Sequence, residues 1–278
     1  MTRAHEAEAA LRNQLAAGSS SAALDAALLL AHVLGLSRAA LAARPELELT
    51  AAQAVRLGQF AVRRAAGEPL AYLTGRREFW SFELDVTPDV LVPRPETELL
   101  VEWALEALVG RPRPAVLDLG TGSGAIALAI ARERPDANIT AVDISEPALA
   151  VARGNAGRLT LANLQFVSGN WFEPVAAARF DAIVSNPPYI AAGDPELDGL
   201  AHEPRVALVA GADGLRALEV ICAGAGSRLA SGGCLLVEHG ATQGAQVRAW
   251  MAQSGLAGIE SRCDLAGRER ATRGNSRR

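Results

Sequence analysis

The first part of the chain has the spacing of apolar residues that is typical of helices. Between residues 6 and 67, Ala, Leu and Arg dominate, and apolar side chains recur every three or four residues. Thr50 followed by Gln53 has the form of a capping box, which marks the start of a helix. Further candidate starts are Ser21 and Ser37, and candidate ends are Gly18, Gly35 and Gly67. We therefore predict a small all-α domain over residues 1–74, made of about four short helices.

Aromatic residues and an alternating pattern set residues 75–95 apart from this helical domain. Phe79, Trp80 and Phe82 are followed by Leu84 and Val86, with the spacing of two that is typical of a strand. We expect a short β-hairpin in this segment, which links the helical domain to the rest of the chain.

From residue 96 onward, short apolar runs alternate with helical segments. The runs that predict buried strands span residues 115–119, 138–144, 163–167, 180–184 and 233–237. Helices are predicted over residues 96–108, 125–134, 147–159, 215–229 and 242–254, and a last strand in the Arg-rich end from residue 268. Such alternation predicts an α/β fold with a doubly wound, mostly parallel sheet over residues 96–278.

Composition narrows the functional classes. Of the 278 residues 50% are hydrophobic and 21% are charged, which is typical of a soluble globular protein. All 27 basic residues are Arg, so no lysine is present for a Schiff base or a Walker-type phosphate loop. The net charge of −4 does not favour nucleic acid as the main partner. Cys222, Cys234 and Cys263 lack metal-ligand spacing, so we expect three ordinary core thiols and no metal site.

The sequence shows neither a membrane span nor a secretion signal. The most apolar stretch, residues 22–36, is shorter than the ~20 residues that cross a bilayer, and Asp25 and His32 interrupt it. The N-terminus is acidic and amphipathic, without the apolar core or the cleavage site of a signal peptide. We expect the protein to stay in the cytoplasm.

A glycine-rich turn, residues 116–127 (VLDLGTGSGAIA), lies between a predicted strand and a predicted helix. Glycines there let the backbone approach a ligand, and the helix offers free N–H groups, so a nucleotide-like ligand is expected. Gly120, Gly122 and Ala125 fit the dinucleotide fingerprint, so NAD and S-adenosylmethionine both stay open. Asp143, after the next strand, could accept hydrogen bonds from ribose hydroxyls, which both cofactors have. The alternating glycines of residues 118–124 look like the first motif of Rossmann-like methyltransferases, which favours S-adenosylmethionine.

Residues 181–189 (DAIVSNPPY) carry the most specific signal in the chain. They contain the fourth predicted strand of the sheet, whose carboxyl end opens beside the glycine turn. The side-chain oxygen of Asn186 and the backbone carbonyl of Pro187 can accept both N–H bonds of one planar NH₂ group. Pro187 and Pro188 keep the turn extended, and Tyr189 offers a flat face to a planar group. This motif fits methyl transfer to nitrogen and has no role in hydride transfer.

The chemistry of a planar nitrogen explains why positioning is the main requirement. Its lone pair is delocalised, so the nitrogen is a poor nucleophile until acceptors hold the NH₂ group and favour positive charge on it. Orientation can lower the activation barrier by up to ~7–11 kcal/mol. General acid–base catalysis contributes less, typically a rate factor of ~10²–10⁴. Positioning is therefore the larger effect, and no histidine base is required. Adenine, guanine, cytosine and glutamine all satisfy the motif, and the acceptor stays open at this point.

The order of several motifs resembles that of the release-factor glutamine methyltransferases, the PrmC/HemK family. These motifs are residues 91–98 (LVPRPETE), the glycine turn, and residues 168–172 (SGNWF), 185–190 (SNPPYI), 203–204 (EP), 237–240 (VEHG) and 264–270 (DLAGRER). The resemblance covers nearly the whole chain and is weakest over residues 1–60. It implies a Rossmann-like methyltransferase that modifies N5 of the glutamine in the Gly-Gly-Gln loop of peptide chain release factors. The helical domain would help to bind that protein.

The resemblance also implies roles for individual residues. The cofactor, S-adenosylmethionine, would contact Gly120, Thr121, Gly122, Ser123, Gly124, Asp143, Trp171 and Asn186 and leave as S-adenosylhomocysteine. The substrate glutamine would contact Asn186, Pro187, Pro188 and Tyr189, of which Asn186, Pro187 and Tyr189 form the catalytic set. Two residues depart from the family pattern: Asn170, where Asp is frequent, and His202, where an aromatic residue is more usual.

Three alternatives stay open on sequence alone. Ribosomal-protein glutamine methyltransferases perform the same chemistry, but their linker differs after Val-Pro-Arg, so residues 95–98 favour the release-factor branch. A DNA or RNA amino-methyltransferase would be expected to carry a basic groove and a recognition module, and the sequence shows neither. A non-catalytic nucleotide-binding module would bind the cofactor without turnover.

Overall fold

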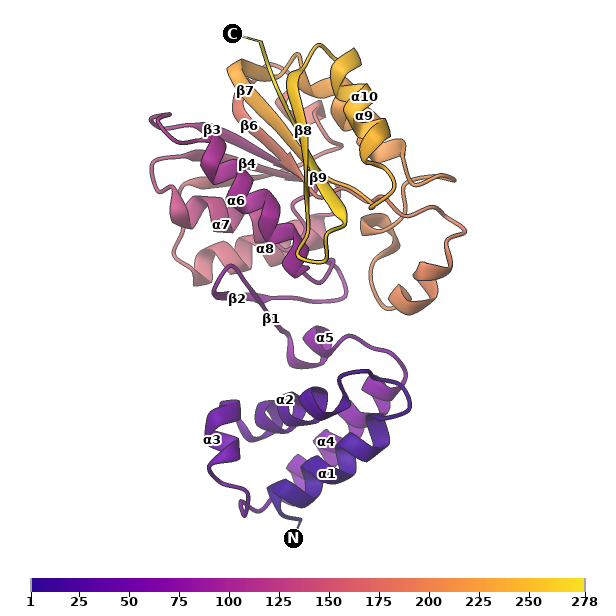
Figure 1. The fold of residues 1–278 in the computed structure, drawn as a ribbon. Coiled ribbons are helices and arrows are strands. Elements are labelled where there is room, and N and C mark those ends of the chain that lie inside the picture. Colours follow the sequence, from indigo (N-terminus) through magenta and orange to yellow (C-terminus); the bar gives the residue numbers. More distant parts are fainter. Residues whose placement is uncertain (1, 278) are drawn as a thin grey trace. The chain divides into compact units, whose positions relative to one another are not determined.

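The computed structural model describes residues 2–277, and the chain divides into two compact units, Met1–Arg76 and Arg77–Arg278. The first unit is all-α, and the second holds a seven-stranded sheet. Figure 1 shows the helices of the first unit and the strands of the second. None of the helices within residues 2–277 is long and apolar enough to cross a membrane.

The first unit contains the helices α1 (Ala4–Leu15), α2 (Ala22–Leu34), α3 (Arg38–Ala42), α4 (Ala51–Ala65) and α5 (Leu70–Thr74). The capping box is present, because Thr50 Oγ1 accepts from the N–H of Gln53 at 3.2 Å and the Gln53 side chain accepts from the N–H of Thr50 at 2.9 Å. Gly35 ends α2 in the left-handed region, with φ 66°, where glycine meets no steric penalty. The apolar faces of α1, α2 and α4 bury a common core that includes Leu11, Leu29 and Phe60.

A two-stranded hairpin, β1 (Arg76–Phe79) and β2 (Phe82–Asp85), follows the helices. Phe79 and Leu84 are buried in the core cluster of the second unit. Asn155 holds the end of β2, since its side-chain oxygen accepts from the N–H of Asp85 at 2.7 Å and its NH₂ group donates to the Asp85 carbonyl at 3.0 Å. The hairpin is therefore packed and hydrogen-bonded within the second unit.

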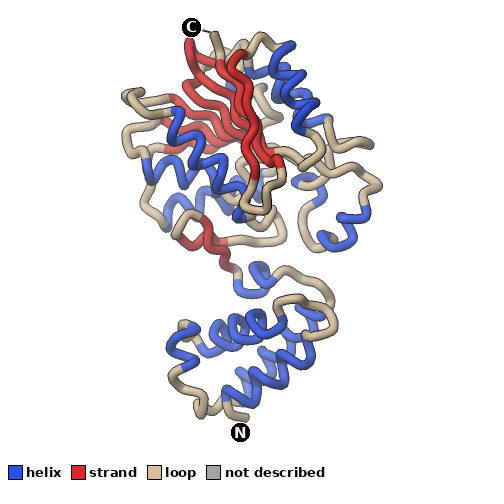
Figure 2. The backbone as a smooth tube through the Cα atoms, viewed as in Figure 1, coloured by secondary structure: helices blue, strands red, loops and turns tan. Residues whose placement is uncertain are grey.

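The large sheet has the order β5-β4-β3-β6-β7-β9-β8. Its strands are β3 (Ala115–Leu119), β4 (Asn138–Asp143), β5 (Leu164–Ser168), β6 (Phe180–Ser185), β7 (Leu229–Glu238), β8 (Ala257–Cys263) and β9 (Glu269–Asn275). Strands β3 to β7 are parallel, while β9 pairs antiparallel with both β7 and β8. Figure 2 shows these strands side by side in red.

Helices cover both faces of the sheet. One core cluster joins the sheet to α6 (Glu98–Ala107), α7 (Ala125–Glu133) and α8 (Glu146–Arg158), and a second joins the opposite face to α9 (Arg216–Ala225) and α10 (Gly244–Gln253). Figure 1 shows the two groups of helices on opposite sides of the strands. Strand residues alternate between the clusters, as with Val116 and Leu117. The predicted fold class, a doubly wound and mostly parallel sheet with a small helical N-terminal part, is confirmed.

The prediction of three core thiols was wrong for one cysteine. Cys222 and Cys234 are buried, whereas Cys263 is exposed. Cys263 is the last residue of β8, the edge strand of the sheet, whose residues are all half-buried or exposed. The predictions also lacked β8 itself, although its partner β9 was expected as a last strand.

Candidate functional site

A cavity of about 490 Å³ opens at the carboxyl ends of β3, β4 and β6. The chain runs outward from β3 to β4 and β5 and then returns to place β6 on the other side of β3. Such a reversal leaves a crevice outside the strand ends, where ligands bind in open α/β sheets. Its lining includes residues 89–91, 93–94, 120–123, 142–145, 169–171, 186, 188, 206–207 and 209–211. The predicted glycine turn and acceptor motif therefore border the same space.

The glycine turn after β3 adopts backbone angles that only glycine accepts without strain. Gly120 and Gly124 have φ of 71° and 87°. A Cβ atom on Gly124 would lie 2.9 Å from Leu128 Cδ1, so this glycine permits close packing at the start of α7. Residues 120–123 line the cavity, whereas Gly124 lies behind them against α7 and α8.

Asp118, in the strand β3 before this turn, is hydrogen-bonded to the turn and to the helix that follows it. The side chain is fully buried, and its Oδ2 accepts from Thr121 Oγ1 at 2.7 Å and from the N–H of Ala127 at 3.2 Å. Its Oδ1 has no hydrogen-bond partner among residues 2–277. Burial raises the pKa of Asp118 to about 7. Asp118 thus joins the turn to the first residues of α7.

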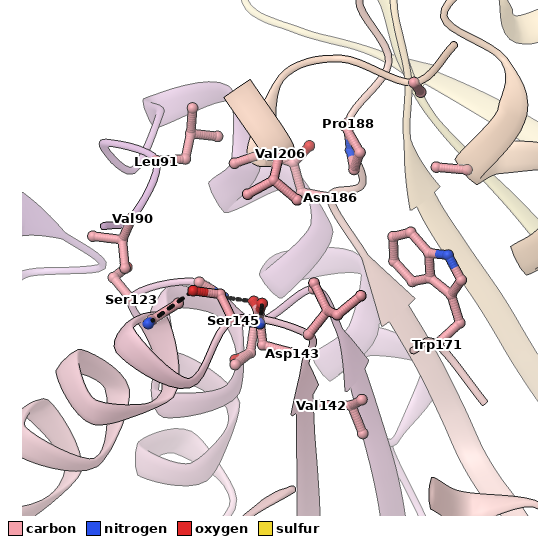
Figure 3. Close-up of a pocket in the computed structure, with 18 of the residues that line it drawn as sticks. Val90, Leu91, Ser123, Val142, Asp143, Ser145, Trp171, Asn186, Pro188 and Val206 are labelled. Atoms are coloured by element: carbon pink, nitrogen blue, oxygen red, sulfur yellow. Dashed lines mark hydrogen bonds between the residues drawn. The ribbon is translucent and has the colours of Figure 1, made fainter. Parts of the chain in front are cut away.

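Asp143 lies at the end of β4, at the floor of the cavity in Figure 3. Its Oδ2 accepts from the N–H of Gly122 at 2.8 Å, and its Oδ1 accepts from the N–H of Ser145 at 2.9 Å. Burial raises the pKa of Asp143 above its ordinary value. Each carboxylate oxygen keeps further lone pairs with which to accept from a ligand.

Trp171 and Asn170 form a side wall of the cavity. The Trp171 ring lies over the glycine turn, 3.5 Å from where a Cβ of Gly120 would stand, and its backbone has a φ of 47°. The NH₂ group of Asn170 donates to Glu173 Oε1 at 3.3 Å. Figure 3 shows Trp171 on one side of Asp143 and Val90 on the other.

The acceptor motif follows β6 on the opposite side of the cavity from Asp143, as Figure 3 shows for Asn186 and Pro188. The Nδ2 group of Asn186 donates to Thr97 Oγ1 at 3.0 Å, while no donor within residues 2–277 reaches its Oδ1. Tyr189 is held elsewhere: its hydroxyl donates to Glu238 Oε1 at 3.1 Å, and its ring packs against the core of the second sheet face. Asn186 and Pro188 line the cavity, whereas Pro187 is buried beside it.

Both parts of the chain match models of known protein domains. Residues 5–75 match the model of the PrmC N-terminal domain, and residues 95–203 match the methyltransferase small domain. The release factor glutamine methyltransferase of Burkholderia pseudomallei is 52% identical over 260 residues, which is 91% of each chain. This chain belongs to the release factor glutamine methyltransferase family. The member from Coxiella burnetii is 48% identical and covers 95% of this chain and 96% of its own.

A solved structure outside this family shows the same fold. The T. thermophilus 16S rRNA N2 G1207 methyltransferase, in complex with AdoMet and guanosine, superposes with a TM-score of 0.52 at 21% identity. The match covers 73% of this chain and 50% of that protein.

The structure assigns contacts to family motifs for which the sequence predicted no role in this chain. Glu203, buried in the segment before α9, accepts from Arg94 Nη2 at 2.5 Å and from the N–H of Val92 at 3.0 Å. Arg94 lines the cavity, so this ion pair connects the lining at Arg94 to the segment that contains Glu203. Thr97 and Glu238 are also buried beside Asn186 and Tyr189. No local pattern marks these pairs, because their members are more than one hundred residues apart.

Proposed function

We propose that this protein transfers a methyl group from S-adenosylmethionine to the side-chain nitrogen of a glutamine in peptide chain release factors, at their Gly-Gly-Gln loop. The observation that carries the proposal is that the glycine turn, Asp143 and Asn186 border one cavity. The names of the relatives at 52% and 48% identity support the substrate. The related fold in complex with AdoMet supports this cofactor over NAD.

The cavity residues fit S-adenosylmethionine. The cavity volume of about 490 Å³ lies within the ~300–1,000 Å³ range of small-molecule pockets. Gly120 and Gly122 allow close approach of the backbone, and the Asp143 oxygens can accept from ribose hydroxyls. Since the NH₂ group of Asn170 already donates to Glu173, its oxygen is left to accept from an exocyclic amine, as an Asp would. The Trp171 ring would complete this side of the site.

The acceptor motif positions the substrate. When bound, S-adenosylmethionine would supply an electrophilic methyl group on its sulfur. Asn186 Oδ1 and the Pro187 carbonyl accept the two N–H bonds of the substrate amide and thereby fix its plane. As the nitrogen lone pair bonds to the methyl carbon, the sulfur–methyl bond would break and leave S-adenosylhomocysteine. The same two oxygens stabilise the positive charge on the nitrogen until one N–H proton passes to water. Pro188 shapes the turn, and Tyr189 anchors its end through the hydrogen bond from its hydroxyl to Glu238.

The division of the chain fits this function. We propose that residues 1–74 recognise the release factor, that residues 75–95 link the domains, and that residues 96–278 carry out the transfer. In α4, the apolar side chains of Val55 and Val62 are 63% and 65% exposed, two helical turns apart on one face. These residues are available to an apolar partner surface. A translation factor as substrate supports the proposal that the protein acts in the cytoplasm.

The proposal is tested with purified protein, S-adenosylmethionine labelled on its methyl group, and a release factor. We expect label on the intact release factor and none on a version whose Gly-Gly-Gln glutamine is replaced by alanine. Ribosomal proteins and nucleic acids serve as competing substrates in parallel reactions. Transfer only to one of these, or cofactor binding without transfer to any substrate, would overturn the proposal.

A further inference from the structure

Asn186 of the acceptor motif is hydrogen-bonded to two buried polar side chains, Thr97 and Glu238, in series. Asn186 follows β6 and Glu238 ends β7, and these neighbouring strands are in register at Ser185 and Val237. Thr97 ends the short helix η1 (Pro95–Thr97) and lies between them. The NH₂ group of Asn186 donates to Thr97 Oγ1 at 3.0 Å, and Thr97 Oγ1 donates to Glu238 Oε2 at 2.7 Å.

The charge on Glu238 determines the direction of both hydrogen bonds in the series from Asn186 through Thr97 to Glu238. A carboxylate can only accept, so the Thr97 hydroxyl must give its hydrogen to Glu238. The Thr97 oxygen can then only accept from Asn186, which requires the NH₂ end of that amide to face Thr97. Asn186 Oδ1 consequently faces the other way, without a donor among residues 2–277, on a side chain that lines the cavity. A flipped amide would set its oxygen against the Thr97 lone pairs and its NH₂ group toward the substrate NH₂.

Glu238 is well placed to act in this way. It is 1% exposed, and it accepts a second hydrogen bond from the Tyr189 hydroxyl at 3.1 Å. The groups that face it are Thr97 and Glu96 from η1, Tyr189 from the acceptor motif and Arg270 from β9. Burial raises the pKa of Glu238, while the Thr97 and Tyr189 hydroxyls and the Arg270 charge lower it.

We propose that Thr97 and Glu238 are positioning residues, which orient the Asn186 amide so that its oxygen meets the substrate nitrogen. The proposal rests on the proposed function for the identity of the substrate. The orientation itself is a property of the free protein. A protonated Glu238 no longer dictates the direction of the Thr97 hydroxyl, so the active orientation is lost as pH falls through the raised pKa of Glu238.

The first test compares Thr97→Val, which keeps the shape without the hydroxyl, with Thr97→Ser, which keeps the hydroxyl. Directly removing an aimed polar group costs about 10²–10³-fold in kcat, and misorienting one should cost less, roughly 10- to 100-fold. We expect that loss for Thr97→Val at unchanged KM for the release factor, and recovery to within about threefold for Thr97→Ser. Thr140→Val is the matched control, since Thr140 is a buried β4 threonine whose Oγ1 accepts from Gln165 at 2.7 Å. A Thr97→Val enzyme within twofold of wild type, or Thr97→Ser as slow as Thr97→Val, overturns the proposal.

The second test needs no substrate, so it separates this inference from the proposed function. The ¹⁵N resonance of the Asn186 side-chain amide, assigned with Asn186→Ala, is followed against pH in the wild type and in Glu238→Gln. We expect it to titrate in the wild type and to be flat in Glu238→Gln, whose pH–rate profile should also lose its acid limb. An Asn186 resonance that titrates equally in both proteins overturns the proposal that Glu238 orients Asn186 through Thr97. A titrating resonance without methyl transfer to the release factor overturns only the proposed function.

Discussion

Replacing Asn186 by alanine separates the cost to the reaction from the cost to the fold. Among residues 2–277, the side chain makes one hydrogen bond, to Thr97 at 3.0 Å, so its loss should lower the free energy of unfolding by about 1 kcal/mol. Toward the substrate, the change removes one of the two aimed oxygens, which corresponds to about 10²–10³-fold in kcat. The variant should therefore be folded and nearly inactive.

Asn163→Ala is the matched control for this experiment. The Asn163 side chain donates to the carbonyls of Ala131, Arg134 and Ala137 at 3.1–3.3 Å, away from the cavity lining. Its removal should destabilise the protein more than Asn186→Ala while leaving kcat near the wild-type value. The assay is methyl transfer to release factor at saturating cofactor, alongside thermal unfolding and calorimetric cofactor binding. If Asn186→Ala keeps more than half of the wild-type kcat, or if Asn163→Ala loses as much, the assigned role is wrong.

Substitutions at three further positions probe the turn, its buried acid and the acceptor motif. Gly124→Ala should lower the free energy of unfolding by about 2–3 kcal/mol, because φ is 87° and the new Cβ would lie 2.9 Å from a leucine methyl carbon. Gly154→Ala is the control, since a Cβ at this helical position meets nothing within 4 Å, and it should not lower stability. Equal unfolding midpoints for the two variants would contradict this. Burial raises the folded-state pKa of Asp118 from 3.8 to about 7, so its contribution to stability is full at low pH and falls as pH rises through that window. Urea unfolding from pH 4 to 8 should show a shallower decline for Asp118→Asn, and an unchanged slope would refute the assignment. Tyr189→Phe removes a donor that lowers the pKa of Glu238, so the acid limb of the kcat–pH profile should move to higher pH. The loss of kcat should be only a few-fold in Tyr189→Phe and larger in Tyr189→Ala. An unmoved acid limb in Tyr189→Phe would argue against the hydroxyl contact.

Local patterns allowed much of the fold to be predicted. The Thr50 and Gln53 capping box and the left-handed Gly35 are features of consecutive residues, and both occur as expected. The parallel strands were predictable because each is a short apolar run between helices. β8 was not, since its burial is intermediate to exposed along its length and no buried apolar run marks it. Its position at the edge of the sheet comes from pairing with β9, which is tertiary information.

The candidate site divides in the same way. The glycine turn and the acceptor motif each lie in one stretch of sequence, so their residues could be named, and the strand order brings them to one cavity. The supporting pairs could not be predicted, because Thr97 and Glu238 are 141 residues apart and meet only through the packing of η1 against the end of β7. The Tyr189 hydroxyl contact was missed for the same reason. The sequence suggested a flat ring, and only the fold shows the buried carboxylate that the hydroxyl reaches.

The most direct measurement is a crystal structure of the protein with S-adenosylhomocysteine and a Gly-Gly-Gln peptide from a release factor. We expect the glutamine NH₂ group within hydrogen-bond distance of both Asn186 Oδ1 and the Pro187 carbonyl, with the cofactor product against the glycine turn and Asp143. A glutamine side chain directed away from these two oxygens, or an Asn186 amide whose NH₂ group faces the substrate, would contradict it.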